Sequence, residues 1–460
     1  MSSDILKVHA QAPLSASLVQ SLLAARKSLP GDMLFKTRLH IADALGIATA
    51  ARPSELARFV LEGQKAAAGD GVCQLIGGGQ ASAMAAAFIN SSLIHILDYD
   101  DIHDVGRLHP ATVILPAVLA AAELVDASDQ EIIEAVALGN ELICRLGVVC
   151  APQGDGPGSE WFLTQLLGYI AASFAAGLVL GLSPRKLVSS IGLAYMQAAG
   201  GKQAGFGIGS NGRAIYPAFA AQGGVQAALL ARAGMDGPEG ALDGAASLFQ
   251  IYLGRPLTES QREALLDFSS WHFLDVDIKP WPSCRLSHPY VAAGIAARDI
   301  FALQPAAGVR VAVNASAARL CRPLQARRQP ETLQDAKYSI PFMTAFALVH
   351  GAPSLASLND SVLSDKAVLD MAARVQLDEG LADNPGHPAA VLTLEHEGNV
   401  LIRSVFKAAD LEMDETRIRS KFIDCFRHGA VQHNAQAAWQ SVLDGRVRAA
   451  IRLSDGRHGS

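Results

Sequence analysis

The sequence predicts a mostly α protein, with a large all-α helical domain and an inserted, smaller α+β lid domain. Half of the 460 residues are hydrophobic, whereas 18% are charged and 6% aromatic, which is typical of tightly packed, alanine-rich helices. Apolar residues recur with a helical period through the first half of the chain, and strand-like alternation begins only later. A chain of this length exceeds what one hydrophobic core usually fills, so two domains are expected.

The first part of the chain has the pattern of one helix after another. Several expected helices begin with capping signals, such as Ser183 before Pro184 and the capping box of Ser128 and Glu131. The periodic apolar stretches predict helices at 34–50, 54–67, 81–97, 112–125, 129–147, 164–180, 184–198 and 220–232. This region is therefore expected to be nearly all α.

Strand patterns appear in the second part of the chain. Residues 309–314 alternate between apolar and polar side chains like a half-buried strand. Residues 390–396 and 400–406 have the pattern of a hairpin whose turn contains Gly398 and Asn399. These segments predict a small α+β unit.

Helical patterns return after this unit, at 414–426 and 432–443. The economical interpretation is that the C-terminal segment rejoins the first domain. We therefore expect a helical domain formed by residues 1–264 and 409–460, interrupted by an α+β lid domain at 265–408.

Composition and charge exclude several classes of partner. The formal net charge of −6 is spread without long like-charge runs, which leaves no basic surface for nucleic acid and no polybasic membrane tether. The longest apolar runs fall short of the roughly 20 residues that span a bilayer. The six cysteines show no C-x-x-C spacing, and the N-terminus lacks a signal-peptide profile, so we expect a cytoplasmic protein with a small-molecule ligand.

Titratable side chains concentrate in one short stretch between two expected apolar helices. It contains His95, Asp98, Asp100, Asp101, His103 and His109 in a chain dominated by alanine and leucine. Loops held by rigid helices are where catalytic groups tend to gather, so this stretch is the candidate active site. The alternative is that its aspartates cap or solvate a turn while His95 is a satisfied core histidine.

Several segments, in this order and spacing, resemble the MmgE/PrpD family. They are Asp43-Ala-Leu-Gly46, Ala86-Ala-Phe-Ile-Asn90 leading into His95-Ile-Leu-Asp-Tyr-Asp-Asp101, His109-Pro110, Ala220 to Leu230 with Gly234 to Pro238, Lys279 to Cys284 with Ser287-His288-Pro289, and Ala336 to Phe342. The family includes 2-methylcitrate dehydratases, cis-aconitate decarboxylases and iminodisuccinate epimerases. The resemblance implies a helical domain with a lid, an interdomain cleft, homodimers, and chemistry on small di- or tricarboxylates without metal or organic cofactor.

Four family positions match in this sequence. The resemblance places the family's aspartate at Asp98, its histidine before an apolar helix at His109, its lysine at Lys279 and its later histidine at His288. Asp101 lies close to the first of these and joins the expected catalytic set.

Two other segments depart from the family pattern, at three positions, and mark a divergent member. Phe162 stands where many members carry a histidine. Arg213 and Tyr216 stand where the common segment has lysine and histidine. Two familiar acid/base imidazoles are therefore replaced.

Elimination, decarboxylation and epimerisation beside a carboxylate all need fixed cations to hold that carboxylate while charge develops. Arg213 offers a planar bidentate fork, Lys279 a point charge, and Arg285 a possible third cation. The alternative for each is an ordinary ion pair. Cys284 and His288, in the neighbouring family segments, complete the expected substrate-binding residues.

Proton transfer is assigned to histidine and tyrosine. His109, and less clearly His103, titrates near neutral pH, and Asp98 or Asp101 could orient His109 or ionise Tyr216. Tyr216 is a good proton donor, although it could instead be a packed aromatic, and Pro217 predicts that it lies in a loop before a helix. Phe162 is expected to form a pocket wall, which suggests a substrate with an apolar group or fewer charges.

Four functions remain open from the sequence. The first is a metal-independent lyase, of the dehydratase or decarboxylase type, and the second is an isomerase or epimerase on a similar carboxylate. The third is a divalent-metal hydrolase that would use Asp100, Asp101, His103 and His109, although no fixed-spacing metal signature is present. The fourth is a catalytically silent carboxylate-binding protein, raised by the two replaced histidines.

Overall fold

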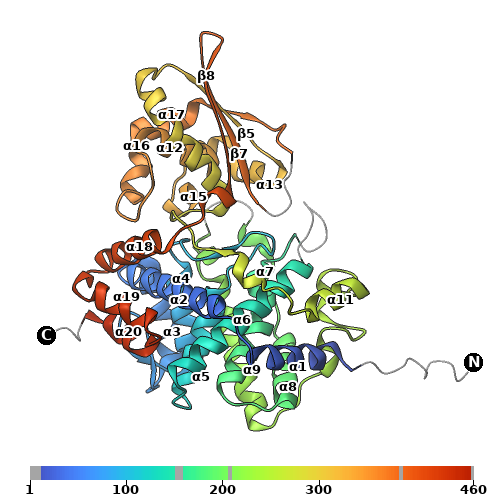
Figure 1. The fold of residues 1–460 in the computed structure, drawn as a ribbon. Helices are drawn as coiled ribbons and strands as arrows, with labels where there is room; N and C mark the ends of the chain where they lie inside the picture. Colours follow the sequence, from blue (N-terminus) through green and yellow to red (C-terminus); the bar gives the residue numbers. More distant parts are fainter. Residues whose placement is uncertain (1–11, 151–158, 206–209, 383–386, 457–460) are drawn as a thin grey trace, which may run out of the picture.

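The computed structural model describes residues 12–150, 159–205, 210–382 and 387–456, and their buried side chains form two main hydrophobic cores (Figure 1). The larger core draws on residues 14–278 and returns to the C-terminal helices at 418–451. The smaller core draws on residues 290–394. We call these the large part and the small part. The expectation of a mostly α protein with a smaller α+β region is confirmed.

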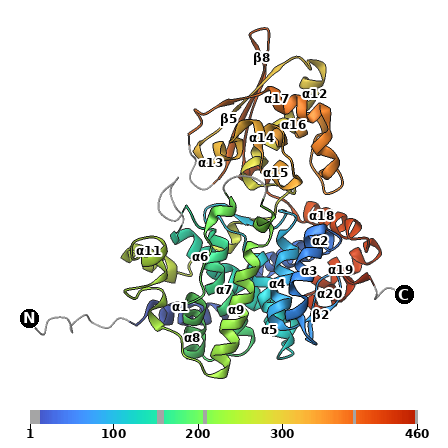
Figure 2. The ribbon, with the colours of Figure 1, turned by 180° about the vertical axis from the view of Figure 1, so that it is seen from behind.

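The large part is a bundle of helices whose central members pack closely on one another. Helix α9 packs against α4, α5 and α7, helix α5 also contacts α4 and α7, and Figure 2 shows α7 and α9 running side by side through the middle of the bundle. A Cβ added at Gly224 of α9 would lie 2.5 Å from the Cβ of Ala172 on α7. Glycine at this position therefore permits the close approach. The helices are α1 (Leu14–Arg26), α2 (Gly31–Ala51), α3 (Glu55–Ala68), α4 (Ala83–His95), α5 (Ala111–Glu123), α6 (Asp129–Cys150), α7 (Leu163–Val179), α8 (Pro184–Tyr195), α9 (Tyr216–Ala233), α10 (Leu248–Tyr252), α11 (Glu259–Leu266), α18 (Glu415–His428), α19 (Ala435–Leu443) and α20 (Val447–Leu453).

All eight helices predicted for this region are present, with ends that differ by a few residues. The Ser183 hydroxyl accepts from the Lys186 N–H, and Ser128 and Glu131 form the expected reciprocal capping box. Helices α1 and α20 were not predicted. The expectation that Tyr216 precedes its helix was wrong, because α9 begins at Tyr216 and accommodates Pro217 in its first turn, where no intrahelical N–H is needed.

The small part is a four-stranded sheet covered by helices (Figure 1). Strand β5 (Gly308–Ala312) lies between β6 (Val375–Asp378), to which it is parallel, and β7 (Ala389–His396), which continues antiparallel into β8 (Asn399–Lys407). Glu397 and Gly398 both have positive φ at the hairpin turn, so the predicted hairpin is confirmed. The helices are α12 (His288–Leu303), α13 (Ala315–Ala318), α14 (Leu324–Arg328), α15 (Leu333–Lys337), α16 (Ile340–His350) and α17 (Lys366–Arg374).

A buried ion pair fixes the segment that leads from the large part towards the small part. The Arg145 Nε lies 2.6 Å from the Glu141 Oε1, and both side chains are almost fully buried. Arg145 donates to the carbonyls of Ala264 and Ser270, while Glu141 accepts from the Phe273 N–H. Each charge is thus also bonded to the backbone of the connecting segment, which holds that segment against α6.

Two further contacts place the connection beside the polar loop that follows α4. The short strands β3 (Ile102–His103) and β4 (Val276–Asp277) pair antiparallel. Lys421 of α18 forms an ion pair with Asp43 at 2.7 Å and donates to the carbonyls of Tyr99 and Lys279. The remaining short pair, β1 (Cys73–Gln74) and β2 (Gln80–Ala81), packs near α4. None of the described helices is both long and apolar enough to cross a bilayer.

Candidate active site

A buried lysine and two aspartates form the centre of the candidate site. The Lys279 Nζ donates to the Asp98 Oδ1 at 2.8 Å and lies 3.8 Å from the Asp100 Oδ1. Burial alone would lower the pKa of Lys279, but the two carboxylates raise it. Burial would likewise raise the pKa of Asp100, yet His95, His109 and Lys279 together lower it. The ammonium and both carboxylates are therefore charged at neutral pH.

Two imidazoles meet at Asp100. The His95 Nδ1 lies 2.7 Å from the Asp100 Oδ2, and the His109 Nδ1 lies 3.5 Å from the same oxygen. The His109 Nδ1 is also 2.6 Å from the backbone carbonyl of Asp101. Because a carbonyl can only accept, this nitrogen carries the proton and Nε2 keeps a lone pair. Burial, with Lys279 and His95 nearby, lowers the pKa of His109 to about 4, so it is a neutral base at physiological pH.

The side chain of Asp101 points away from this cluster. Its carboxylate lies 2.8 Å from the His40 Nδ1 and accepts from the Ala111 N–H at the start of α5. Burial and the neighbouring Asp100 raise the pKa of Asp101 to about 8, whereas burial lowers that of His40. The catalytic role expected for Asp101 stays a prediction; what this geometry shows is that the Asp101 carbonyl fixes the tautomer of His109.

Tyr216 and Phe162 form an aromatic wall beside the imidazoles. The two rings stack with centroids 4.1 Å apart and an interplanar angle of 13°. The Tyr216 ring also meets the edge of His95, at 5.0 Å between centroids. Thr164 hydrogen-bonds to the Tyr216 hydroxyl, and its Oγ1 accepts from the His109 N–H at 3.0 Å. Burial raises the pKa of Tyr216, so its hydroxyl stays protonated and is a candidate donor.

Arg213 approaches the cluster from the side of Tyr338. Its Cζ lies 3.5 Å from the centroid of the Tyr338 ring, and the Tyr338 hydroxyl hydrogen-bonds to Asp98. Cys284 lies within electrostatic reach of both Asp98 and Arg213, and burial followed by Asp98 raises the pKa of its thiol. Among the described residues, no carboxylate lies within ion-pair distance of Arg213, and its buried Nε has no hydrogen-bond partner. Its Nη1 donates to the Gly205 carbonyl at 3.4 Å, so Nε is the buried donor of this guanidinium that lacks a partner among the described residues.

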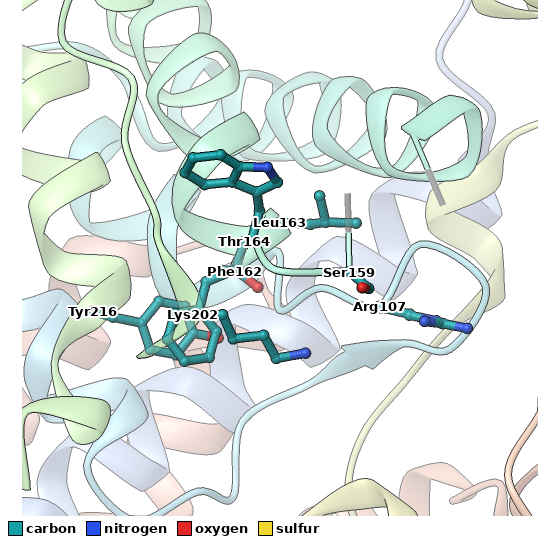
Figure 3. A pocket seen from close by; sticks show the side chains of 8 residues that line it. Arg107, Ser159, Phe162, Leu163, Thr164, Lys202 and Tyr216 are labelled. Atoms are coloured by element: carbon teal, nitrogen blue, oxygen red, sulfur yellow. The ribbon is translucent and has the colours of Figure 1, made fainter. Parts of the chain in front are cut away.

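A pocket opens on the other side of the aromatic wall (Figure 3). About 330 Å³ of space lies in this pocket, part of which is continuous with open solvent. The lining residues are Arg107, Ser159, Trp161, Phe162, Leu163, Thr164, Lys202 and Tyr216. Of the predicted site residues, Phe162 and Tyr216 line this pocket, whereas Asp98 and Lys279 are buried and do not line it. The expectation that Phe162 forms a pocket wall agrees with its position.

His103 belongs to a different environment from the cluster. Its Nδ1 accepts from the Gly106 N–H at 2.8 Å, and its neighbours are His272 and Asp275. Since Nδ1 accepts, Nε2 carries the proton and offers no lone pair to a metal. This geometry argues against the substrate-binding role expected for His103. The metal-hydrolase alternative needs Asp100, Asp101, His103 and His109 to share one site. Neither His103 nor Asp101 faces Asp100, so these four residues do not form one cluster.

The three residues His95, Asp100 and His109 do bring ligand-type atoms within 4.8 Å of one another. However, the fixed ammonium of Lys279 lies 3.8 Å from the Asp100 carboxylate. A buried positive charge at this distance opposes a divalent cation at the same carboxylate. The arrangement is better suited to orienting imidazoles for proton transfer than to holding a metal.

Arg285 and His288 are occupied by protein partners. The Arg285 guanidinium forms ion pairs with Asp104, at 2.7 Å, and with Asp277. His288 is fully buried at the start of α12, where its ring meets the edge of Trp281. The Arg285 Nη1 and the His288 Nδ1 are nevertheless buried without a hydrogen-bond partner among the described residues, so the expected substrate contact of these two side chains stays a prediction. Arg285 forms ordinary ion pairs, which was the alternative expected for it.

Several residues of the site were not in the predicted set. Asp100 was expected only as a ligand in the metal-hydrolase alternative and His95 only as a core histidine, and the spacing of a histidine five residues before an aspartate was the available signal. Tyr338 lies in the Ala336 to Phe342 segment, which resembles the family, but it had no expected role. His40 and Lys202 gave no local signal, because each joins the site through contacts distant in sequence.

The family comparison agrees with this geometry and with the motifs. Residues 21–261 match the MmgE/PrpD N-terminal domain, and residues 281–444 match the MmgE/PrpD C-terminal domain. The chain belongs to the MmgE/PrpD family.

Several proteins similar to this chain are named as cis-aconitate decarboxylases or as decarboxylase-like. The chain is 29% identical over 280 residues to a cis-aconitate decarboxylase of Aspergillus terreus, which covers 58% of this chain and 56% of the relative. It is 37% identical over 177 residues to a cis-aconitate decarboxylase-like protein of Aspergillus oryzae, 36% of each chain. The human cis-aconitate decarboxylase is 24% identical over 302 residues, 64% of this chain and 61% of the relative. The chain thus spans little more than half of the A. terreus relative that it matches.

Proposed function

We propose that this protein is a metal-independent lyase that acts on a small di- or tricarboxylic acid, with decarboxylation as its reaction. The observation that carries the proposal is that Arg213, which has no carboxylate partner among the described residues, lies within electrostatic reach of the protonated Tyr216 hydroxyl, while Thr164 joins that hydroxyl to the backbone of the neutral His109. The names of the A. terreus and human relatives favour decarboxylation over dehydration.

Decarboxylation of an unsaturated tricarboxylate needs one proton for each carbon dioxide. The bond to the leaving carboxylate breaks, its electron pair moves into the conjugated system, and carbon is then protonated. In our proposal Arg213 holds a retained carboxylate and stabilises the charge that develops on it. Tyr216 donates the proton to carbon, and solvent returns it to the tyrosine. Lys279 and Asp98 keep their charges throughout and fix the loop that carries His109.

The same residues could also return a proton to the carbon from which it was removed, which is the isomerase alternative. His109, with a lone pair on Nε2, would be its base. Wash-in of solvent deuterium without net conversion would favour this reaction. A silent binding protein would bind carboxylates and release no product.

A product screen tests the proposal. The protein, before and after exhaustive chelation, is incubated with citrate, methylcitrate, cis-aconitate, citraconate or iminodisuccinate, and products are followed by NMR. We expect conversion of at least one acid that survives chelation and falls at least 100-fold in Arg213→Ala. Arg185→Ala, at an exposed arginine of α8, is the matched control and should keep full activity. Loss of activity on chelation, restored by one metal, would favour a hydrolase instead.

A further inference from the structure

The pocket beside Phe162 contains a lysine that the proposed reaction does not use. Lys202 is held there by backbone pairing between two segments: the Phe162 N–H donates to the Gly200 carbonyl, and the Lys202 N–H donates to the Glu160 carbonyl, each at 2.7 Å. A Cβ at Gly205 would lie 2.9 Å from the Lys202 Cγ and 3.2 Å from the Phe162 Cζ. The lysine stem therefore packs over this glycine and along the phenylalanine ring.

Two basic side chains, Lys202 and Arg107, line this pocket. Figure 3 shows the Lys202 ammonium between the stacked rings of Phe162 and Tyr216 on one side and the Arg107 guanidinium on the other. Burial, then Arg213 and Arg107, lowers the pKa of Lys202. Glu160 is the nearby acid and is solvent-exposed, and within the described ranges no carboxylate lies in ion-pair distance of Lys202.

The backbone at the start of α7 adds to the positive electrostatic potential in this pocket. Leu163 and Thr164, in the first turn of α7, line the same pocket, and no side chain caps this helix end. The 17-residue helix therefore directs its positive end towards the space that Lys202 faces.

We propose that this pocket is a subsite for a second carboxylate of the substrate, with Lys202 as the residue that selects for it. The inference rests on the proposed function, and it defines the substrate class more narrowly. One carboxylate is held near Arg213, apolar atoms lie on Phe162, and a second carboxylate reaches Lys202. The substrate is thus an open-chain acid with carboxylates at both ends, and the phenylalanine that replaces the family histidine contacts its apolar middle.

The subsite is tested by binding, without turnover. Affinities for glutarate and tricarballylate are compared by calorimetry with those for their mono-amides, which lack one charge. We expect the wild-type protein to prefer each acid over its mono-amide by about 10- to 100-fold, the range typical of a charge-assisted hydrogen bond. In Lys202→Met and Lys202→Gln this preference should fall to within about threefold. Lys202→Arg should retain most of it.

Lys186→Met is the control, since the ammonium of this exposed lysine bonds only to a backbone carbonyl among the described contacts. It should keep the wild-type preference. The proposal is overturned if the Lys202 variants, folded by circular dichroism, retain the wild-type preference, or if the wild-type protein shows none. Because binding is measured without chemistry, a protein that shows the preference but converts no acid would refute the proposed function and leave the subsite standing.

Discussion

Replacing Lys279 by methionine should strongly destabilise the protein. The Lys279 side chain is fully buried and the Asp98 side chain is 3% exposed, with 2.8 Å between Nζ and Oδ1. At an effective dielectric constant of about 20, two unit charges at this distance attract by about 6 kcal/mol, much of which offsets desolvation. Removing only the cation leaves two buried carboxylates, at Asp98 and Asp100, without it. We therefore expect a loss of about 3–5 kcal/mol in the free energy of unfolding.

The assay is urea unfolding followed by far-UV circular dichroism. Lys366→Met is the matched control, because Lys366 pairs with Asp370 on an exposed surface, where the side chains are 84% and 64% accessible. It should change stability by no more than about 0.5 kcal/mol. Adding Asp98→Asn to Lys279→Met should recover part of the loss, since one unpaired charge is removed. A loss in Lys279→Met no larger than in Lys366→Met would refute the assignment of a buried, charged cluster.

Three further perturbations probe other parts of the site. Tyr216→Phe should lower turnover by roughly 10²- to 10⁴-fold with a smaller effect on apparent affinity, and unchanged steady-state kinetics would make this residue a wall only. His40→Gln should cost about 1–3 kcal/mol in urea unfolding, because the buried Asp101 carboxyl loses its hydrogen bond to the imidazole Nδ1, and wild-type stability would contradict that pairing. The hydrogen bond to Asp104 raises the pKa of His387 above 6.5, so its stabilisation is present below that pH and is lost as pH rises through the raised value. The Tm difference between the wild type and His387→Gln should therefore shrink from pH 6 to pH 9, and a difference that grows would have the wrong sign.

Local signals in the sequence account for most of the fold. Helices with a clear apolar period and a capping residue, such as α8 after Ser183, are specified by the chain near them. Helix α1 has no side-chain cap and follows Pro13, so its start carries a weak signal. The start of α9 at Tyr216 was missed because Pro217 has two opposite local effects. Proline disfavours a helical conformation in the residue before it, yet it is favoured in the first turn of a helix. In this protein Pro217 lies in the first turn of α9.

The candidate site was harder to predict than the fold. Asp100 and Asp101 are adjacent in sequence, yet one faces His95 and the other faces His40. Asp100 lies at a bend of the backbone, and Asp101 directly precedes β3, so the direction of each side chain is set by an irregular segment. Composition and motifs identify such a stretch, but they do not determine which of two neighbouring carboxylates faces the imidazoles.

The contact between Lys202 and Phe162 could not be predicted from the sequence either. It meets Phe162 only because residues 160–162 pair with 200–202, a contact between segments that lie on opposite sides of α7 and α8 in the chain. No periodic pattern or short motif records such a pairing. The charge of the pocket therefore became visible only in three dimensions.

The most direct test of the central claim is the isotopic content of the product formed from cis-aconitate in deuterium oxide. The account predicts one carbon dioxide per substrate consumed and a single deuterium on the carbon that was protonated, both nearly abolished in Tyr216→Phe. Conversion without carbon dioxide, or deuterium exchange into unconverted substrate alone, would contradict decarboxylation by this site.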